Sequence, residues 1–93
     1  MQWYRFVSEG KVQHVFYRKF VSEAMRRKGF RGYIRNLPDG QVETVVFVYD
    51  EDEEIDTILS VLREGSPMSE VTHIAYEPID AVEHNEEGFV IRY

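Results

Sequence analysis

Apolar and polar side chains alternate over residues 3–9, a pattern that predicts a β-strand whose two faces are buried to different extents. A short loop follows, and then apolar residues recur at helical spacing and predict an amphipathic helix. These apolar residues are Phe20, Val21, Ala24 and Met25. The helix is predicted to end at Lys28-Gly29, because a basic last turn is followed there by a residue that tolerates the left-handed conformation.

A hairpin and a second helix are predicted in the middle of the chain. Residues 32–37 and 41–49 have the composition of strands, and the turn signal Pro38-Asp39-Gly40 between them predicts a β-hairpin. Apolar residues at positions i, i+3, i+4 and i+7 over residues 55–62 predict the second helix. This helix is predicted to end at Gly65-Ser66-Pro67.

Two more strands are predicted after this helix, over residues 71–79 and 89–93, joined through a polar turn at residues 83–87. The resulting order β-α-β-β-α-β with a short extra strand is typical of a ferredoxin-like α+β fold, in which both helices cover one face of an antiparallel sheet. Right-handed crossovers then place the end of the first strand beside the third, and the hairpin brings the second strand close by. We expect a single domain over residues 1–93.

Charge is distributed unevenly along the chain, whose net charge is −6. Residues 1–35 contain nine of the eleven basic side chains and two acidic ones, whereas the remaining residues contain two basic and fifteen acidic ones. The basic third can therefore attract an anion although the protein as a whole is acidic. Residues 50–54 are five consecutive acids, and we assign them to the first turn of the second helix rather than to a metal site, because acids there stabilise the helix dipole.

Several kinds of site are disfavoured by what the sequence lacks. Without cysteine there is no disulfide, no thiol nucleophile and no cysteine-based zinc site, which fits a reducing compartment. The three histidines have neither triad nor metal-site spacing, and His73 and His84 are expected at the surface or at its boundary and not as ligands. The longest apolar run, residues 45–49, is too short to span a bilayer, and the chain opens directly into a strand pattern without a leader. We therefore expect a cytoplasmic protein with no membrane partner.

The candidate functional site is the stretch from Gly10 to Arg18, where the first strand passes into the first helix. N–H groups in the first turn of a helix are unpaired and carry partial positive charge, so such a junction binds anions well. Arg18 lies one turn into the helix and can direct a fork of donors at the same anion. The stretch therefore predicts a phosphate-binding loop.

Phosphoryl chemistry suits a chain that is poor in catalytic groups, because it depends mainly on alignment and on charge stabilisation. Our hypothesis is that backbone N–H groups wrap the phosphate oxygens while Arg18 clamps two of them. The residues that supply these N–H groups are Gln13, His14, Val15, Phe16 and Tyr17. Asn36 does not titrate and so cannot act as a base, but its carbonyl oxygen can hold a water molecule and aim it at phosphorus.

Two blocks of the sequence resemble the signatures of the acylphosphatase family. The first signature, G-x-V-Q-G-V-x-F/Y-R, is similar to Gly10-Lys11-Val12-Gln13-His14-Val15-Phe16-Tyr17-Arg18. The second signature is similar to residues 32–43, and residues 65–67 and 88–93 match the late loop and the ending of the family. The resemblance implies hydrolysis of small acyl phosphates without metal or cofactor. It also implies that Arg18 holds the phosphate, that Asn36 positions water, and that the substrate's own phosphate takes up the proton of the water.

His14 stands where the family pattern has the second glycine of the loop. A glycine there supplies a positive φ or lets the ligand approach closely, and histidine adopts the left-handed region at a cost of about 1–3 kcal/mol. Its ring could narrow the mouth of the loop or add a cationic donor below about pH 6.5. An alternative function is therefore a catalytically impaired anion-binding or regulatory domain of the same fold.

A third possibility is an RNA-binding module, because split β-α-β sheets can stack bases on aromatic side chains such as Tyr33, Phe47 and Tyr49. The acidic remainder of the chain opposes it, and the sequence contains no Lys/Arg-Gly-Phe-x-Phe run of the RNA-binding kind. We therefore expect a monomer whose partner is a small acyl phosphate and not a nucleic acid.

Overall fold

The computed structural model describes residues 1–80, 82–84 and 86–93. The elements follow the predicted order β-α-β-β-α-β with a short final strand, and their ends differ from the predicted ones by a few residues at most. They are β1 (Gln2–Lys11), α1 (Tyr17–Arg27), β2 (Arg31–Asn36), β3 (Val42–Val48), α2 (Glu51–Glu64), β4 (Glu70–Ile79) and β5 (Phe89–Ile91). None of the helices in this described part is both long enough and apolar enough to cross a membrane.

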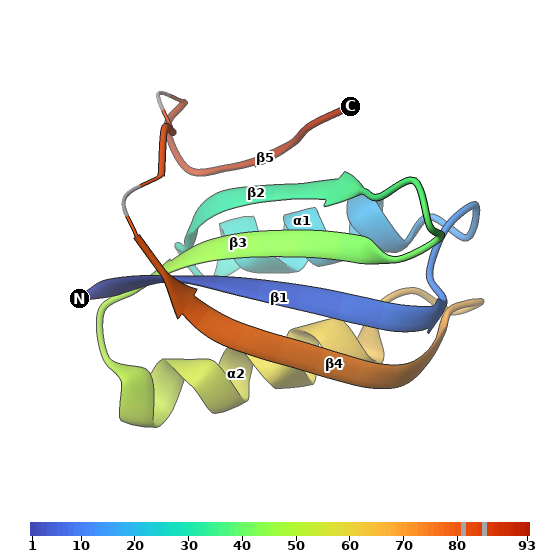
Figure 1. Cartoon of the computed structure of the whole chain (residues 1–93), viewed down its shortest axis with the longest axis horizontal. Coiled ribbons are helices and arrows are strands. Elements are labelled where there is room, and N and C mark those ends of the chain that lie inside the picture. Colours follow the sequence, from blue (N-terminus) through green and yellow to red (C-terminus); the bar gives the residue numbers. More distant parts are fainter. Residues whose placement is uncertain (81, 85) are drawn as a thin grey trace.

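The strands form one sheet in the order β4-β1-β3-β2-β5 (Figure 1). The pairs β4–β1, β1–β3 and β3–β2 are antiparallel, as predicted, but β5 runs parallel to β2. The predicted antiparallel sheet is therefore confirmed for these four strands, and the short extra strand, whose direction was not predicted, makes the sheet mixed. The reason is topological: β4 ends at the end of the sheet where β2 begins, so a chain that crosses that end and turns back enters β5 alongside β2.

The core lies between the sheet and the two helices, which cover the same face. Phe6 of β1 and Val46 of β3 are fully buried there, and they pack against Met25 of α1 and Ile58 of α2. The alternating pattern of the first strand is confirmed, because Phe6 and Ser8 are fully buried whereas their neighbours Arg5, Val7 and Glu9 are partly exposed. The five acids also lie where they were predicted: Asp50 caps α2 by accepting a hydrogen bond from the N–H of Asp52.

On the uncovered face of the sheet, Glu43 is held between two arginines. Its carboxylate accepts hydrogen bonds from Arg5 at 2.5 Å and from Arg35 at 2.6 Å. Burial alone would raise the pKa of Glu43, but the hydrogen bonds from the two guanidinium groups outweigh burial and leave its pKa below the ordinary value. An otherwise costly buried carboxylate is thereby kept ionised and tied to both neighbouring strands.

His73 is exposed on β4, as predicted, but the prediction that His84 lies at the surface or at its boundary is wrong. The side chain of His84 is fully buried, with its ring 5.9 Å from the ring of Trp3 and 6.4 Å from that of Tyr33. Its Nε2 lies 3.1 Å from the carbonyl oxygen of Gly88. The polar turn predicted over residues 83–87 includes Asn85, which lies outside the described residues. His84 is buried because aromatic residues of two strands form a pocket that the local sequence does not reveal.

The fold brings the carboxyl ends of three strands and the start of one helix to the same end of the sheet. Because β1 and β2 are each antiparallel to β3, they run in the same direction, and β5 runs parallel to them. Their carboxyl ends therefore lie together, beside the start of α1, at the right-hand side of Figure 1. This end carries the strand-to-helix junction that the sequence marks as the candidate site.

Candidate active site

The junction between β1 and α1 is a tight loop with free donors. After β1 the chain turns sharply, with the N–H of Val12 bonded to the carbonyl of Gly10 at 3.1 Å, and α1 begins at Tyr17. Within the described part of the chain, the backbone N–H groups of residues 13–19 donate no hydrogen bond, and the first bond of the helix is donated by Phe20 to Phe16. These unpaired N–H groups, together with the positive end of the helix dipole, are what an anion site requires.

Two side chains, one from the loop and one from outside it, tie the loop to its surroundings. The side-chain amide of Gln13 donates to the carbonyls of Leu37 and Gln41, each at 2.8 Å, and so ties the loop to the β2–β3 hairpin. The hydroxyl of Ser66, which follows α2, donates to the carbonyl of Val15 at 2.6 Å. The loop is therefore fixed on two sides, and the side chain of Gln13 serves the hairpin rather than the site.

Tyr17 anchors the start of α1 in the core. Its side chain is 1% exposed, and its hydroxyl donates to the carbonyl of Leu62 at 2.7 Å and lies 3.0 Å from the hydroxyl of Ser8. Burial raises the pKa of Tyr17 to about 12, although the hydrogen bond with Ser8 opposes the rise. Gly65 leaves room for this ring, because a Cβ at that position would lie 2.7 Å from it. The phenol thus faces away from any ligand, and only the backbone of Tyr17 can serve one.

Two residues of the loop have left-handed backbones. His14 has φ +63° and Phe16 has φ +61°, so His14 adopts the conformation that a glycine would supply at its position. Each such residue costs about 1–3 kcal/mol, and strain of this kind persists where the surrounding structure holds it in place. Phe16 has no local sequence signal for a positive φ. Its ring is 72% exposed, so packing of the ring does not explain the conformation.

Arg18 is positioned by the chain that follows β5. One of its terminal nitrogens lies 3.4 Å from the carbonyl oxygen of Arg92, and its guanidinium carbon lies 4.9 Å from the centre of the Tyr93 ring. Arg92 in turn stacks on Tyr33 of β2 at 3.9 Å. These contacts hold the guanidinium across the end of the sheet instead of leaving it in solvent.

Arg18 and Asn36 face the same cavity, which has a volume of about 470 Å³. Asn36 is the last residue of β2, and its side-chain oxygen is buried without a hydrogen-bond partner among the described residues. A buried acceptor without a partner is rare in folded proteins and marks a place for a water molecule or a ligand. The residues that line the cavity are Val12, His14, Phe16, Tyr17, Arg18, Lys19, Asn36, Ile91 and Tyr93.

Most of the residues predicted from the sequence meet here, but two do not reach the cavity. His14, Phe16, Tyr17, Arg18 and Asn36 line it, whereas Gln13 bonds the hairpin and Val15 is buried in the core. For these two, only the backbone N–H groups remain available to a phosphate.

Sequence reasoning missed Lys19, Ile91 and Tyr93 as parts of the site. The ending of the chain did match the family pattern, but spacing alone gives no signal that a residue after the last strand lies over Arg18.

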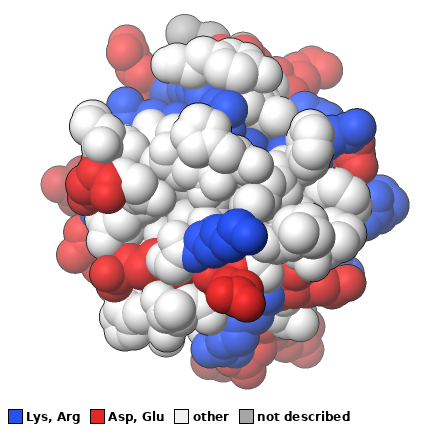
Figure 2. All heavy atoms as spheres, turned by 90° about the vertical axis from the view of Figure 1, so that its right-hand side faces the viewer, with Lys and Arg blue, Asp and Glu red and all other residues white. Residues whose placement is uncertain are grey.

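The cavity is positively charged. Arg18 and Lys19 line it, and no Asp or Glu side chain of the described residues does so. Figure 2 faces this end of the molecule and shows basic side chains between neutral groups in its upper half, with acidic side chains around them. The local charge therefore favours an anion although the chain as a whole is acidic.

Fold and cavity together define a small α/β sandwich with a loop of unpaired backbone N–H groups at a strand-to-helix junction. The acylphosphatase family model matches residues 4–91, which is nearly the whole chain. An acylphosphatase of Methanocella arvoryzae is 37% identical over 83 residues, which cover 89% of this chain and 90% of the relative. An acylphosphatase of Caldivirga maquilingensis is 34% identical over 89 residues, which cover 96% of this chain and 92% of the relative. The chain belongs to the acylphosphatase family.

A solved structure supports the same assignment. The crystal structure of acylphosphatase from Bacillus subtilis superposes on the fold with a TM-score of 0.85 and 29% sequence identity, and the match covers 100% of both chains. The ferredoxin-like arrangement predicted from the sequence, with its short extra C-terminal strand, is therefore confirmed.

Proposed function

We propose that this protein hydrolyses the carboxyl–phosphate bond of small acyl phosphates to a carboxylate and inorganic phosphate. Membership of the acylphosphatase family supports the reaction class. The observation that carries the assignment of roles is that Arg18, Asn36 and the unpaired N–H groups of the loop converge on one positively charged cavity.

The phosphate is held by the loop and by Arg18. Backbone N–H groups of residues 13–17 surround its oxygens, and the guanidinium of Arg18 binds two of them through its planar fork. Because these donors are fixed before the substrate arrives, they stabilise the charge that develops in the transition state at little cost in reorganisation. The contacts of Arg18 with Arg92 and Tyr93 support this view, since they restrict the guanidinium to the cavity.

Asn36 positions the attacking water. Its buried side-chain oxygen accepts a hydrogen bond from the water and aims the water at phosphorus, opposite the leaving carboxylate. A bond forms between the water oxygen and phosphorus while the bond from phosphorus to the carboxylate oxygen breaks. The proton of the water passes to a phosphate oxygen of the substrate. An acyl phosphate has a good leaving group, so positioning and charge neutralisation suffice, and the step needs neither metal nor cofactor.

The predicted alternative, an impaired domain that binds anions without chemistry, finds no support in the geometry. His14 adopts the left-handed conformation that the loop requires, and the cavity behind it is open. The monomeric state and the cytoplasmic location remain predictions that belong to this proposal. Sedimentation at equilibrium tests the first, and cell fractionation tests the second.

The test of the proposed reaction is an assay of the chelator-treated protein on acetyl phosphate and benzoyl phosphate, with ordinary phosphate monoesters as controls. We expect turnover of both acyl phosphates and none of the monoesters. Replacement of the phosphate clamp, Arg18→Ala, is expected to lower kcat/KM by at least about 100-fold, because preorganised donors to a developing charge have effects of that size.

A matched control for this variant is Arg27→Ala, which removes an exposed arginine from the last turn of the same helix. It is expected to keep the parental rate, and both variants are expected to keep the parental circular dichroism spectrum. Parental turnover by the Arg18→Ala variant would show that the clamp is assigned wrongly.

A further inference from the structure

His14 is the one position of the loop where this chain departs from the family signature, and the residue is among those that line the site. The residue has φ +63° and lines the cavity shared by Arg18 and Asn36. A side chain held at a strained backbone position beside a ligand site is a candidate for a role of its own.

The charged side chains that line the cavity with His14 are basic, so they favour a bound anion. From α1, Arg18 and Lys19 line the same cavity, and Tyr93 lines it from the chain after β5. From β2 the cavity receives only the neutral Asn36. In the hairpin turn beyond it, Asp39 accepts a hydrogen bond from the backbone N–H of Gln41. Among the described residues, no Asp or Glu side chain lines the cavity to neutralise an imidazolium.

We propose that His14 is a substrate-positioning residue that binds the phosphoryl group as a cation, so that the affinity of the site for a tetrahedral oxyanion rises as the pH falls. The inference rests on the proposed function only in that the cavity receives such an anion. A neutral imidazole contributes one donor at most, whereas an imidazolium adds a full charge and donates from both nitrogens. A charge added within contact distance of a partly exposed anion strengthens binding by about 5- to 10-fold.

Sulfate is the probe for this effect, because it stays a dianion between pH 5.5 and 7.5, where phosphate itself changes charge. Its dissociation constant is measured by following the amide NMR signals of residues 14–18 during a titration. In the parental protein we expect binding to tighten by about 5- to 10-fold from pH 7.5 to pH 5.5. In His14→Asn we expect it to change by less than about twofold. Asparagine is chosen because it tolerates the left-handed region and so preserves the loop.

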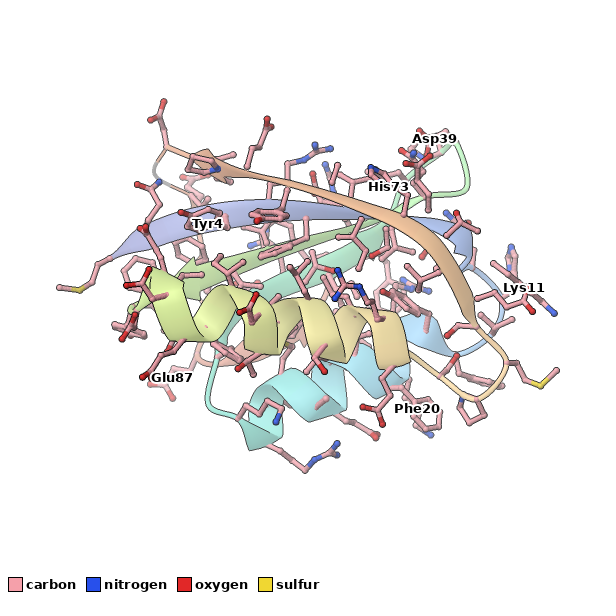
Figure 3. All side chains as sticks on the ribbon, turned by 90° about the horizontal axis from the view of Figure 1, so that it is seen from below. Tyr4, Lys11, Phe20, Asp39, His73 and Glu87 are labelled. Carbon is pink, nitrogen blue, oxygen red and sulfur yellow. The ribbon has the colours of Figure 1, made fainter. Side chains whose placement is uncertain are left out.

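The matched control is His73→Asn, which removes an exposed histidine from β4 (Figure 3). In the strand order, β4 is the edge strand opposite β5. This variant is expected to keep the parental pH dependence. His14→Gly serves as a second variant, because glycine occupies a positive φ without strain and keeps the loop even if asparagine does not.

The inference is overturned if sulfate binding by the parental protein does not change with pH, or if both His14 variants show the same tightening as the parent. A parental protein that tightens on sulfate in this way but does not hydrolyse acetyl phosphate would contradict the proposed reaction and leave the role of His14 standing. Turnover combined with pH-independent sulfate binding would contradict the role of His14 alone.

Discussion

Tyr17 shows how a side chain supports the site without contacting the ligand. Its backbone opens α1 at the cavity, while its phenol reaches through the core to the end of α2. Its hydrogen bonds to Leu62 and Ser8 set the position of the helix start and therefore of the loop before it. A prediction about stability follows, because the hydroxyl satisfies a backbone carbonyl that no water reaches.

Removal of this hydroxyl in Tyr17→Phe is expected to lower the free energy of unfolding at pH 7 by about 1–3 kcal/mol, because a buried carbonyl and a buried serine lose their partner. Urea denaturation measures the change. The control is Tyr49→Phe, whose side chain is 51% exposed and which should alter the free energy by less than about 0.5 kcal/mol. An unchanged stability in Tyr17→Phe would mean that the contact contributes nothing.

The raised pKa of Tyr17 predicts a loss of stability at alkaline pH. The pKa of Tyr17 is raised in the folded state to about 12, from an ordinary value of 10.0. The unfolded chain therefore releases this proton first, and stability is lost as the pH rises from about 10 towards 12. In Tyr17→Phe this part of the alkaline loss should be absent.

At the scale of elements, the loop depends on its neighbours more than on its own sequence. The Gly10–Arg18 pattern, the spacing to Asn36 and the helix start predict an anion loop, and these parts come together as expected. What local sequence cannot supply is the set of outside contacts. Ser66 lies 51 residues after Val15 along the chain, so its hydrogen bond to that residue appears only in the folded protein.

The orientation of β5 was unpredictable for the same reason. A strand of three residues pairs along whichever edge the preceding connection reaches, and the pattern of its side chains gives no direction. Tyr93 therefore could not be placed at the cavity, nor His84 in its aromatic pocket. By contrast, both helices and the hairpin were predictable, because their periodicity and their turn residues are local properties.

The contact between the α2–β4 connection and the loop can be tested by Ser66→Ala. This change leaves the carbonyl of Val15 buried without its donor, so the loop should loosen, and kcat/KM for acetyl phosphate should fall by about 5- to 20-fold. Ser60→Ala on the exposed face of α2 is the matched control and should keep the parental rate. Equal rates for the two variants would show that the loop holds its shape without Ser66.

At the scale of the whole molecule, the topology itself assembles the site. Three strands that run in the same direction end beside the start of α1, and each brings one part: β1 leads into the loop, β2 ends at Asn36, and the chain after β5 lies against Arg18. Arg18 and Lys19, two of the basic side chains of the first third of the sequence, line the cavity at that end, which gives an acidic protein a positive cavity. Catalysis in this account comes from placement, since no residue of the cavity needs to act as a base.

The central claim is that Arg18 binds the phosphate whereas Asn36 positions the attacking water, both in one cavity. It is tested most directly by measuring kcat and the inhibition constant for inorganic phosphate in parallel, for the parental protein, Arg18→Ala and Asn36→Ala. We expect Asn36→Ala to lower kcat by about 100- to 1000-fold while the inhibition constant for phosphate stays within about twofold of the parental value. Arg18→Ala is expected both to lower kcat and to weaken inhibition by phosphate. Parental kcat in Asn36→Ala, or an equal loss of phosphate affinity in both variants, would contradict this division of roles.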